Sequence, residues 1–548
     1  MTKSRQGTGA ERGRPSRAEV PACTPSRLTA ATGVADPMSL AVAPRRVAAV
    51  PGGRAVSRRH GVALALLAGV AWAGAAPPRG WWPLLPLGVA ALTVALRGRR
   101  VRDRMLFGGL TGATLYGSIL WWVTGFSAPG YVVLVMLEAS LLALAAALVP
   151  ATVAGRWAGG WWALPAALVL LEAAQSRFPL GGFPLPGLAL SQVDGPFAGA
   201  APWGGSLLVT AAAASAGVAV ASLLSRPDRR GATIAAAVIA VSALPWTLTA
   251  ASDPVATLDA VVIQGGGVRG VPAVYTDATQ VTDRHLDVLR ELDGSPDLVL
   301  LPENVVDVQG PVAGSLPDRQ IAAQAQRLQA TVVAGVVEKQ AATFRNAALA
   351  WDPTGTLIDR YEKEHRVPFG EYLPARPLLE RLSEATALVP RDAVPGDGQA
   401  LLRTPAGPLG VVISYEVFFA DRVREAVTAG GQVILVPTNA TSYVTEEVPA
   451  LEVAASRLRA REFHRAVLQA APTGYSVIVT PDGAIEQQSE LGATAVLRAV
   501  VPLHTDLTPY ARLGDLPVLA LALAALAAGP VWARRTRAAP HEKPALRP

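Results

Sequence analysis

The stretch Tyr361-Glu362-Lys363-Glu364-His365-Arg366-Val367-Pro368-Phe369-Gly370-Glu371 places one lysine among three glutamates. Two other polar positions close strand-like runs elsewhere in the chain. Glu303 ends the run Leu300-Leu301-Pro302-Glu303-Asn304, and Ser414 follows the apolar run that ends at Ile413. A carboxylate, an ammonium and a nucleophile on separate segments are the groups that acyl transfer needs. The carboxylate takes the nucleophile's proton, the ammonium stabilises the oxyanion, and the nucleophile forms a covalent acyl intermediate.

Each of these residues has an ordinary structural role as an alternative. A glutamate after a strand is usually solvated or pairs with a nearby basic group. A lysine among glutamates, such as Lys363, is most often part of a surface ion-pair network, and a serine such as Ser414 is most often a turn or cap residue. His365 fits a structural hydrogen-bonding role better than that of a base. The three motifs together favour catalysis more than any one of them alone.

Residues 254–511 have ordinary polarity and alternate strand-like with helix-like runs, which predicts an α/β layered domain with catalytic groups at strand ends. The predicted strands are Leu258–Gln264, Asp297–Leu301, Ala330–Val337, Asn346–Trp351, Leu409–Ile413 and Gln432–Val436. The predicted helices are Gln280–Leu292, Asp318–Leu328, Ala420–Thr428 and Leu451–Arg465.

Apolar blocks flank this region, and several reach the roughly 20 residues that cross a bilayer core. Eight such blocks with almost no internal charge exceed what a soluble core holds, so we expect a multi-pass α-helical membrane domain. The blocks cover about 61–76, 81–97, 105–125, 130–154, 160–176, 202–225, 231–250 and 516–533.

Arginine clusters lie in alternate loops, which predicts that both termini are cytoplasmic and that residues 254–511 face outward. The basic side comprises Arg45, Arg46, Arg54, Arg58, Arg59, Arg97, Arg99, Arg100, Arg102, Arg104, Arg156, Arg226, Arg229, Arg230, Arg534, Arg535 and Arg537. The other loops hold only Arg79 and Arg177.

The predicted organisation has five parts. Residues 1–58 form a disordered cytoplasmic leader, 59–253 a membrane domain of seven helices, and 254–511 the outward domain. An eighth helix over 512–533 and a basic cytoplasmic tail over 534–548 follow.

The amino-acid composition excludes several kinds of site. Among 548 residues Cys23 is the only cysteine, which excludes a disulfide framework and a cysteine-based zinc site. The net charge of +7 sits in short clusters between apolar blocks, a pattern typical of membrane topology and not of a nucleic-acid-binding face.

Together the motifs resemble those of the carbon–nitrogen hydrolase (nitrilase) superfamily, whose members carry a Glu–Lys–Cys triad on an αββα sandwich. The match is closer to the apolipoprotein N-acyltransferases. It rests on the run from Tyr361 to Pro374, on Phe183-Pro184 with Ser191-Gln192-Val193-Asp194-Gly195-Pro196, and on Arg459–Ala470 with Gly474 and Thr480-Pro481-Asp482-Gly483.

The resemblance implies transfer of a fatty acyl chain from a membrane phospholipid to the N-terminal amino group of an S-diacylglyceryl-cysteine apolipoprotein, with no cofactor and no metal. It implies that Glu303 is the general base, that Lys363 stabilises the oxyanion and that Ser414 stands at the nucleophile position. Glu371 is then an orienting carboxylate, and Tyr415 and Glu416 match the residues after the family's nucleophile.

The chain departs from the family at the nucleophile, where a serine replaces the thiol. A serine hydroxyl is harder to deprotonate, and its ester is less reactive toward an amine than a thioester. Two alternatives therefore stay open. One is a catalytically inactive membrane scaffold that partners a polyprenol-phosphate mannosyltransferase, and the other is a membrane-tethered amidase with water as acceptor.

Overall fold

The computed structural model describes residues 56–150, 160–185, 187–225, 253–270, 276–382, 386–387 and 389–538, together with 233 and 236–240. The expected leader and basic tail lie largely outside the described residues. So does most of the expected seventh membrane helix over 231–250.

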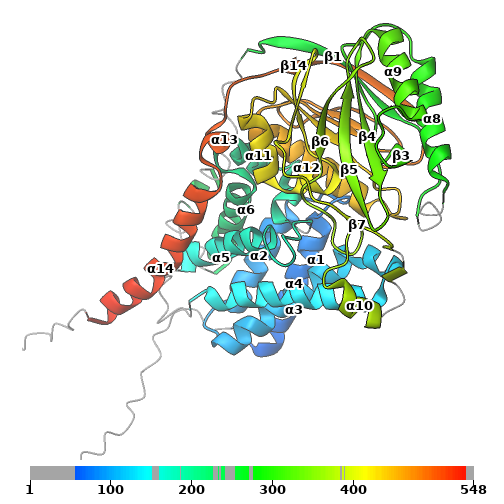
Figure 1. Ribbon diagram of the computed structural model, residues 1–548. Coiled ribbons are helices and arrows are strands. Elements are labelled where there is room, and N and C mark those ends of the chain that lie inside the picture. The colour runs from blue at the N-terminus through cyan, green and yellow to red at the C-terminus, as the bar shows by residue number, and fades with distance from the viewer. Residues whose placement is uncertain are drawn as a thin grey trace, which may run out of the picture. The chain divides into compact units, whose positions relative to one another are not determined.

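Alanine- and leucine-rich segments form a bundle of helices below the sheets in Figure 1. Small residues let neighbouring helices approach closely, as at Gly112, where an added Cβ would lie 2.7 Å from the Cα of Ala139. The elements are α1 (Arg58–Ala75), α2 (Leu84–Leu96), α3 (Val101–Ile119), η1 (Trp121–Gly125), α4 (Ala128–Leu148), α5 (Gly160–Gln175), η2 (Leu188–Gln192), η3 (Pro196–Ala200), α6 (Ala201–Ser225) and the C-terminal α14 (Leu516–Ala538).

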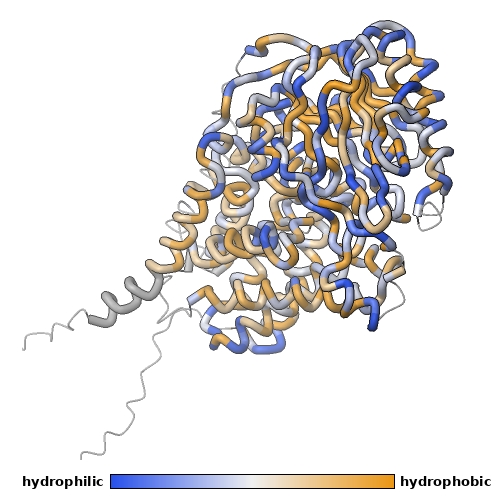
Figure 2. Tube along the Cα trace, in the orientation of Figure 1, coloured by the Kyte–Doolittle hydropathy of each residue, from blue (hydrophilic) through white to orange (hydrophobic). Residues whose placement is uncertain are grey.

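Among the described residues, two helical stretches are long and apolar enough to cross a membrane: Ala128–Leu148 and Pro196–Leu224. The apolar helices Leu84–Leu96, Trp162–Gln175 and Leu516–Ala528 are shorter. Wherever the structure describes them, the expected apolar blocks are largely helical, and the number that span a membrane stays a prediction. Figure 2 shows apolar residues along these helices, and several large ones are exposed, including Val133 and Leu521.

The α/β domain contains two sheets packed face to face. The first has the order β14-β1-β2-β4-β5-β6, with β3 beside β4 and β7 beside β5; the second runs β13-β12-β11-β10-β9-β8. The first sheet comprises β1 (Ala256–Gln264), β2 (Leu298–Leu300), β3 (Val306–Gln309), β4 (Thr331–Lys339), β5 (Thr343–Trp351), β6 (Leu357–Glu362), β7 (Asp392–Ala393) and β14 (Ala495–Leu503). The second comprises β8 (Leu401–Thr404), β9 (Gly407–Val411), β10 (Val433–Pro437), β11 (Val467–Ala470), β12 (Val477–Val479) and β13 (Ile485–Gln488).

Alternate strand residues bury opposite faces, which makes a core between the sheets and another on each outer face. Val262, Leu300, Val411 and Leu435 share the inner core. Helices α8 (Ala278–Glu291) and α9 (Leu316–Leu328) cover the first sheet, while α11 (Ala420–Thr428) and α12 (Glu447–Phe463) cover the second. The expected αββα sandwich is confirmed, and every predicted strand and helix of this domain overlaps an observed one. The short elements α10 (Arg376–Leu382), η7 (Ser414–Phe418) and α13 (Pro509–Leu513) complete it.

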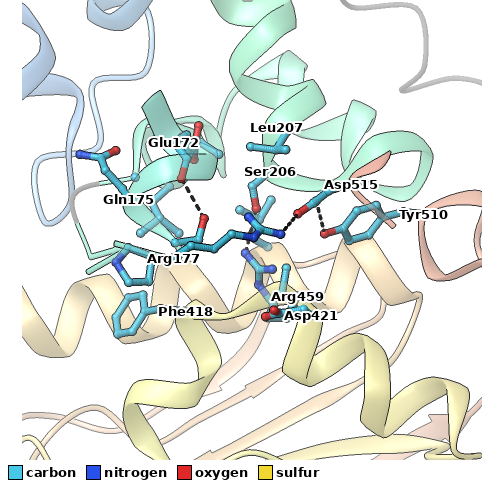
Figure 3. A pocket seen from close by; sticks show the side chains of 17 residues that line it. Glu172, Gln175, Arg177, Ser206, Leu207, Phe418, Asp421, Arg459, Tyr510 and Asp515 are labelled. Atoms are coloured by element: carbon cyan, nitrogen blue, oxygen red, sulfur yellow. Dashed lines mark hydrogen bonds and ion pairs between the residues drawn. The ribbon is translucent and has the colours of Figure 1, made fainter. Parts of the chain in front are cut away.

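Polar contacts join α12 to the helical part of the molecule, as Figure 3 shows. Ser206 of α6 accepts a hydrogen bond from Arg459 at 2.9 Å and donates one to Glu462 at 2.9 Å. Beside these residues, Arg177 in the loop after α5 pairs with Asp515, the residue before α14, at 3.2 Å. Arg177, Ser206, Arg459 and Asp515 line a hollow of about 40 Å³, a volume that suits a few water molecules and is too small for an acyl chain.

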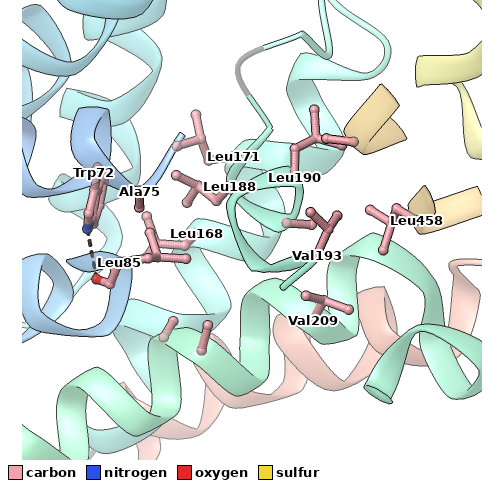
Figure 4. Packing of buried hydrophobic residues seen from close by; sticks show 14 of the residues in the cluster. Trp72, Ala75, Leu85, Leu168, Leu171, Leu188, Leu190, Val193, Val209 and Leu458 are labelled. Atoms are coloured by element: carbon pink, nitrogen blue, oxygen red, sulfur yellow. Dashed lines mark hydrogen bonds between the residues drawn. The ribbon is translucent and has the colours of Figure 1, made fainter. Parts of the chain in front are cut away.

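Apolar side chains continue the same contact. Leu458 of α12 belongs to one buried cluster with Leu190, Val193 and Val209 (Figure 4). Trp72 closes the far side of that cluster and donates its indole hydrogen to the carbonyl of Leu85 at 3.1 Å. The helices and the second sheet therefore share a core, which holds the α/β domain against the end of the helical part.

Candidate active site

A buried ammonium lies between two carboxylates at the ends of first-sheet strands. Lys363, directly after β6, places Nζ 2.9 Å from Oε1 of Glu303 and 2.8 Å from Oε1 of Glu371. Asn346 of β5 donates to the same two oxygens, at 2.7 and 3.1 Å. Lys363 is 2% exposed, so the surface ion-pair alternative is wrong for this lysine. Gly335 permits the close approach, because an added Cβ there would lie 2.4 Å from the Cα of Glu303.

The cluster holds a charged lysine beside an unusually basic carboxylate. Burial alone would lower the pKa of Lys363, but Glu303 and Glu371 outweigh burial and raise it above its ordinary value. Burial raises the pKa of Glu303, and the charge of Glu371 adds to that effect, while Lys363 opposes it. The site therefore offers a permanent cation with a carboxylate that can accept a proton.

Ser414 opens the short helix η7 in a left-handed backbone conformation, with φ at 51°. This conformation costs a residue other than glycine about 1–3 kcal/mol, and it is often found where a side chain must be aimed into a site. Ser414 is 7% exposed. It donates its hydroxyl to Oε1 of Glu452 at 3.4 Å. Within the described part of the chain no hydrogen bond joins Ser414 to Glu303 or Lys363.

Glu452, the carboxylate that Ser414 contacts, also responds to the charges of the lysine cluster. Burial is the largest influence on Glu452 and brings its pKa to about 7, while Glu303 raises that pKa and Lys363 lowers it. That Glu303, Lys363 and Ser414 form one site stays a prediction. Whether they catalyse a reaction stays a prediction.

The two residues after Ser414 hold the turn at Ser414 in place. The carboxylate of Glu416 is fully buried and accepts hydrogen bonds from the Tyr361 hydroxyl and from the backbone amides of Ile413, Glu364 and His365, at 2.8–3.0 Å. It thereby joins this turn to the segment that carries Lys363. Tyr415 donates its hydroxyl to the carbonyl of Gly182 at 2.9 Å and connects the turn to the loop after α5.

Sequence reasoning missed three polar residues of this site: Asn346, Thr438 and Glu452. Asn346 begins a predicted strand whose other residues are all apolar, and that contrast was the available signal. Glu452 and Thr438 carried no comparable signal, because a glutamate on an amphipathic helix and a threonine after a strand are usually exposed.

A cluster of possible metal ligands lies elsewhere. His464, His504 and Asp506 each offer one atom within 4.8 Å of the others. The guanidinium of Arg465 is 3.8 Å from the Asp506 carboxylate, so a cation already faces that oxygen.

Comparison with known proteins agrees with this fold. Residues 266–505 match the carbon–nitrogen hydrolase family, which describes the class of the α/β domain. Residues 68–219 match the apolipoprotein N-acyltransferase N-terminal domain. In both of its parts the chain is therefore similar to the apolipoprotein N-acyltransferases.

Individual proteins show the extent of the similarity. The chain is 27% identical over 485 residues to the apolipoprotein N-acyltransferase of Photobacterium profundum, covering 84% of this chain and 92% of that protein. It is 32% identical over 316 residues to that of Mycolicibacterium smegmatis, covering 54% of this chain and about half, 52%, of that protein. A solved amidase from Nesterenkonia sp. is 19% identical, with a TM-score of 0.35, covering 50% of this chain and 97% of that one.

Proposed function

We propose that this chain is an acyltransferase that moves a fatty acyl chain from a membrane phospholipid to the N-terminal amino group of S-diacylglyceryl-cysteine lipoproteins. Relatives named apolipoprotein N-acyltransferase align with most of its length. The observation that carries the proposal is the buried ammonium of Lys363 between Glu303 and Glu371. Nothing in the packing of a sandwich requires a buried lysine that pairs with one buried and one partly buried carboxylate.

In this mechanism Ser414 attacks the ester carbonyl of the phospholipid and becomes acylated. The charged Lys363 stabilises the negative charge that develops on the carbonyl oxygen. Glu303, held by Lys363 and Asn346, exchanges protons with the departing glycerol oxygen and the incoming amine. The amine then attacks the ester on Ser414, forms the amide and frees the serine.

An assay with both substrates tests this proposal. Purified full-length protein in vesicles of phosphatidylethanolamine should add the mass of one acyl chain to a diacylglyceryl-cysteine peptide. The same peptide with its amino group acetylated should gain nothing. Release of free fatty acid without acylated peptide would contradict the proposal and favour the amidase-like alternative, with water as acceptor.

The second candidate function is an inactive scaffold for a polyprenol-phosphate mannosyltransferase, and the serine at position 414 favours it. A scaffold predicts no acylated peptide under any condition of the same assay. It also leaves the buried Glu303–Lys363–Glu371 cluster without a purpose, and we therefore rank it second.

We infer that the protein is a bacterial membrane protein with eight spans, both termini in the cytoplasm and residues 254–511 outside. Contacts made by Arg58 and Arg99 at one end of the helical bundle support this orientation. Arg58 pairs with Asp103 at 3.4 Å and Arg99 donates to the carbonyl of Ser57 at 3.1 Å. The first two arginine clusters thus meet at one end of the helices, as one cytoplasmic side requires.

Reporter fusions test this topology. Fusions after Arg100 and after Arg230 should report cytoplasm, and a fusion at Gly396 should report the outside. The loops that contain Arg100 and Arg230 flank predicted spans, and positively charged loops are retained on the cytoplasmic side of the membrane. A cytoplasmic signal at Gly396 would contradict both the orientation and an outward active site.

A further inference from the structure

We propose that Glu452 is the catalytic base that removes the proton from Ser414, a role that rests on the proposed acyl transfer. Glu452 belongs to α12, which covers the second sheet, whereas Glu303 and Lys363 extend from the first. Its Oε1 accepts the Ser414 hydroxyl at 3.4 Å and the Thr438 hydroxyl at 2.6 Å. Thr438 follows β10 and is fully buried, so it holds this oxygen beside the serine.

The other carboxylate oxygen has room for a proton. Glu452 is 3% exposed, and its Oε2 has no hydrogen-bond partner among the described residues. A buried carboxylate that receives only hydroxyl donors keeps a raised pKa, because no cation is bonded to its charged form. Glu303 is bound by the Lys363 ammonium and the Asn346 amide on one oxygen, and no hydrogen bond among the described residues joins it to Ser414. Glu452 is therefore better placed than Glu303 to deprotonate the Ser414 hydroxyl.

The proton balance of the reaction closes with this base. As the Ser414 oxygen bonds to the ester carbonyl carbon, its proton passes to Glu452. When the carbon–oxygen bond to glycerol breaks, protonated Glu303 gives a proton to the glycerol oxygen. In the second half the amine loses a proton to Glu303 as its nitrogen bonds to the carbonyl carbon, and the departing Ser414 oxygen regains its proton from Glu452. Both carboxyl groups then return to their starting states.

A base in contact with Ser414 compensates for the weak acidity of the serine hydroxyl. A thiol ionises near pH 8.5 and needs little help beside a cation, whereas a hydroxyl needs a base in contact with it. In this chain the Ser414 hydroxyl contacts Glu452, a buried carboxylate that is separate from Glu303 and Glu371. The expected consequence is that Glu452 matters for a serine nucleophile and much less for a cysteine.

A four-protein comparison tests the assignment: the natural chain, Glu452→Gln, Ser414→Cys and the double variant. Glutamine keeps the shape and the oxygen that Thr438 and Ser414 contact, but it cannot take the proton. Glu452→Gln should lower acyl transfer by the serine enzyme about 100-fold or more. In the Ser414→Cys background the same change should cost less than about tenfold, because Lys363 favours the thiolate.

The pH profile gives an independent readout. Transfer by the natural chain should rise as pH increases through about 7, where Glu452 loses its proton, and Glu452→Gln should remove that rise. The charged and titratable groups that act on Glu452 from neighbouring segments are Glu303, Lys363 and Tyr443. All three stay in place in the variant, so a rise that persisted would overturn the assignment.

Glu462 provides a matched control on the same helix. It is also buried, with a pKa that burial raises to about 7, but it pairs with Arg459 and accepts from Ser206. Glu462→Gln should change the serine and cysteine enzymes by the same factor. Equal losses for Glu452→Gln in the two backgrounds would make Glu452 structural and overturn the inference alone. No transfer by either the natural chain or Ser414→Cys would overturn the proposed function itself.

Discussion

Ser414→Ala is expected to lower acyl transfer by about 10³-fold or more, because the chemistry then has no atom to carry the acyl chain. The natural chain incubated with phospholipid alone should gain the mass of one acyl chain, and the variant should not. Folding should change little, because the serine hydroxyl makes one long hydrogen bond of 3.4 Å and alanine keeps the same Cβ at φ 51°. Intact-protein mass spectrometry and the peptide assay measure both effects.

Ser222→Ala is the matched control. Ser222 is buried in α6 and donates to the carbonyl of Val218 at 2.8 Å, so the change removes one buried hydroxyl far along the chain from η7. Its transfer rate should equal that of the natural chain. If Ser414→Ala transferred as fast as Ser222→Ala, Ser414 would not be the nucleophile and the scaffold function would be preferred.

The layered fold was predictable because its buried strands are apolar runs bounded by polar turns. β1 and β4 were found in this way, and α11 was predicted with the bounds that it has. Some of the missed strands, such as β11 and β12, are buried runs of only three or four residues, and others have no apolar run at all. β6 carries Asp359, Arg360 and Glu362, and β13 is mostly exposed. Local pattern does not separate such edge strands from loops, since their pairing partners supply the stability.

The active site was predictable only where its residues follow strands. Glu303 and Lys363 lie at strand ends of one sheet, which is why they meet although 60 positions separate them. Glu452 is different, because it lies on the helix α12 and 38 positions after Ser414 in the chain. Its burial depends on how α12 packs on the second sheet and on α6, and a single sequence does not show which helical glutamate faces inward.

Lys363→Met is expected to abolish transfer and to weaken the fold. Losing the cation that faces the oxyanion should cost about 10²–10³-fold in rate. It also leaves the buried Glu303 and the partly buried Glu371 without a counter-charge, which should cost about 3–5 kcal/mol of unfolding free energy. Lys339→Met is the matched control. Lys339 pairs with Asp307 at 2.6 Å but is 30% exposed, so its loss should cost less than about 1 kcal/mol and leave transfer unchanged.

The destabilisation by Lys363→Met should depend on pH. Burial and Glu371 already raise the pKa of Glu303, and losing the lysine raises it further. A carboxylate whose folded pKa lies above its unfolded value supports the fold while protonated and loses that support as pH rises through the folded pKa. The gap in melting temperature between the variant and the natural chain should therefore be wider at pH 8 than at pH 5. A variant that melts like the natural chain at pH 8 and still transfers acyl chains would show that neither the fold nor the reaction needs the buried cation.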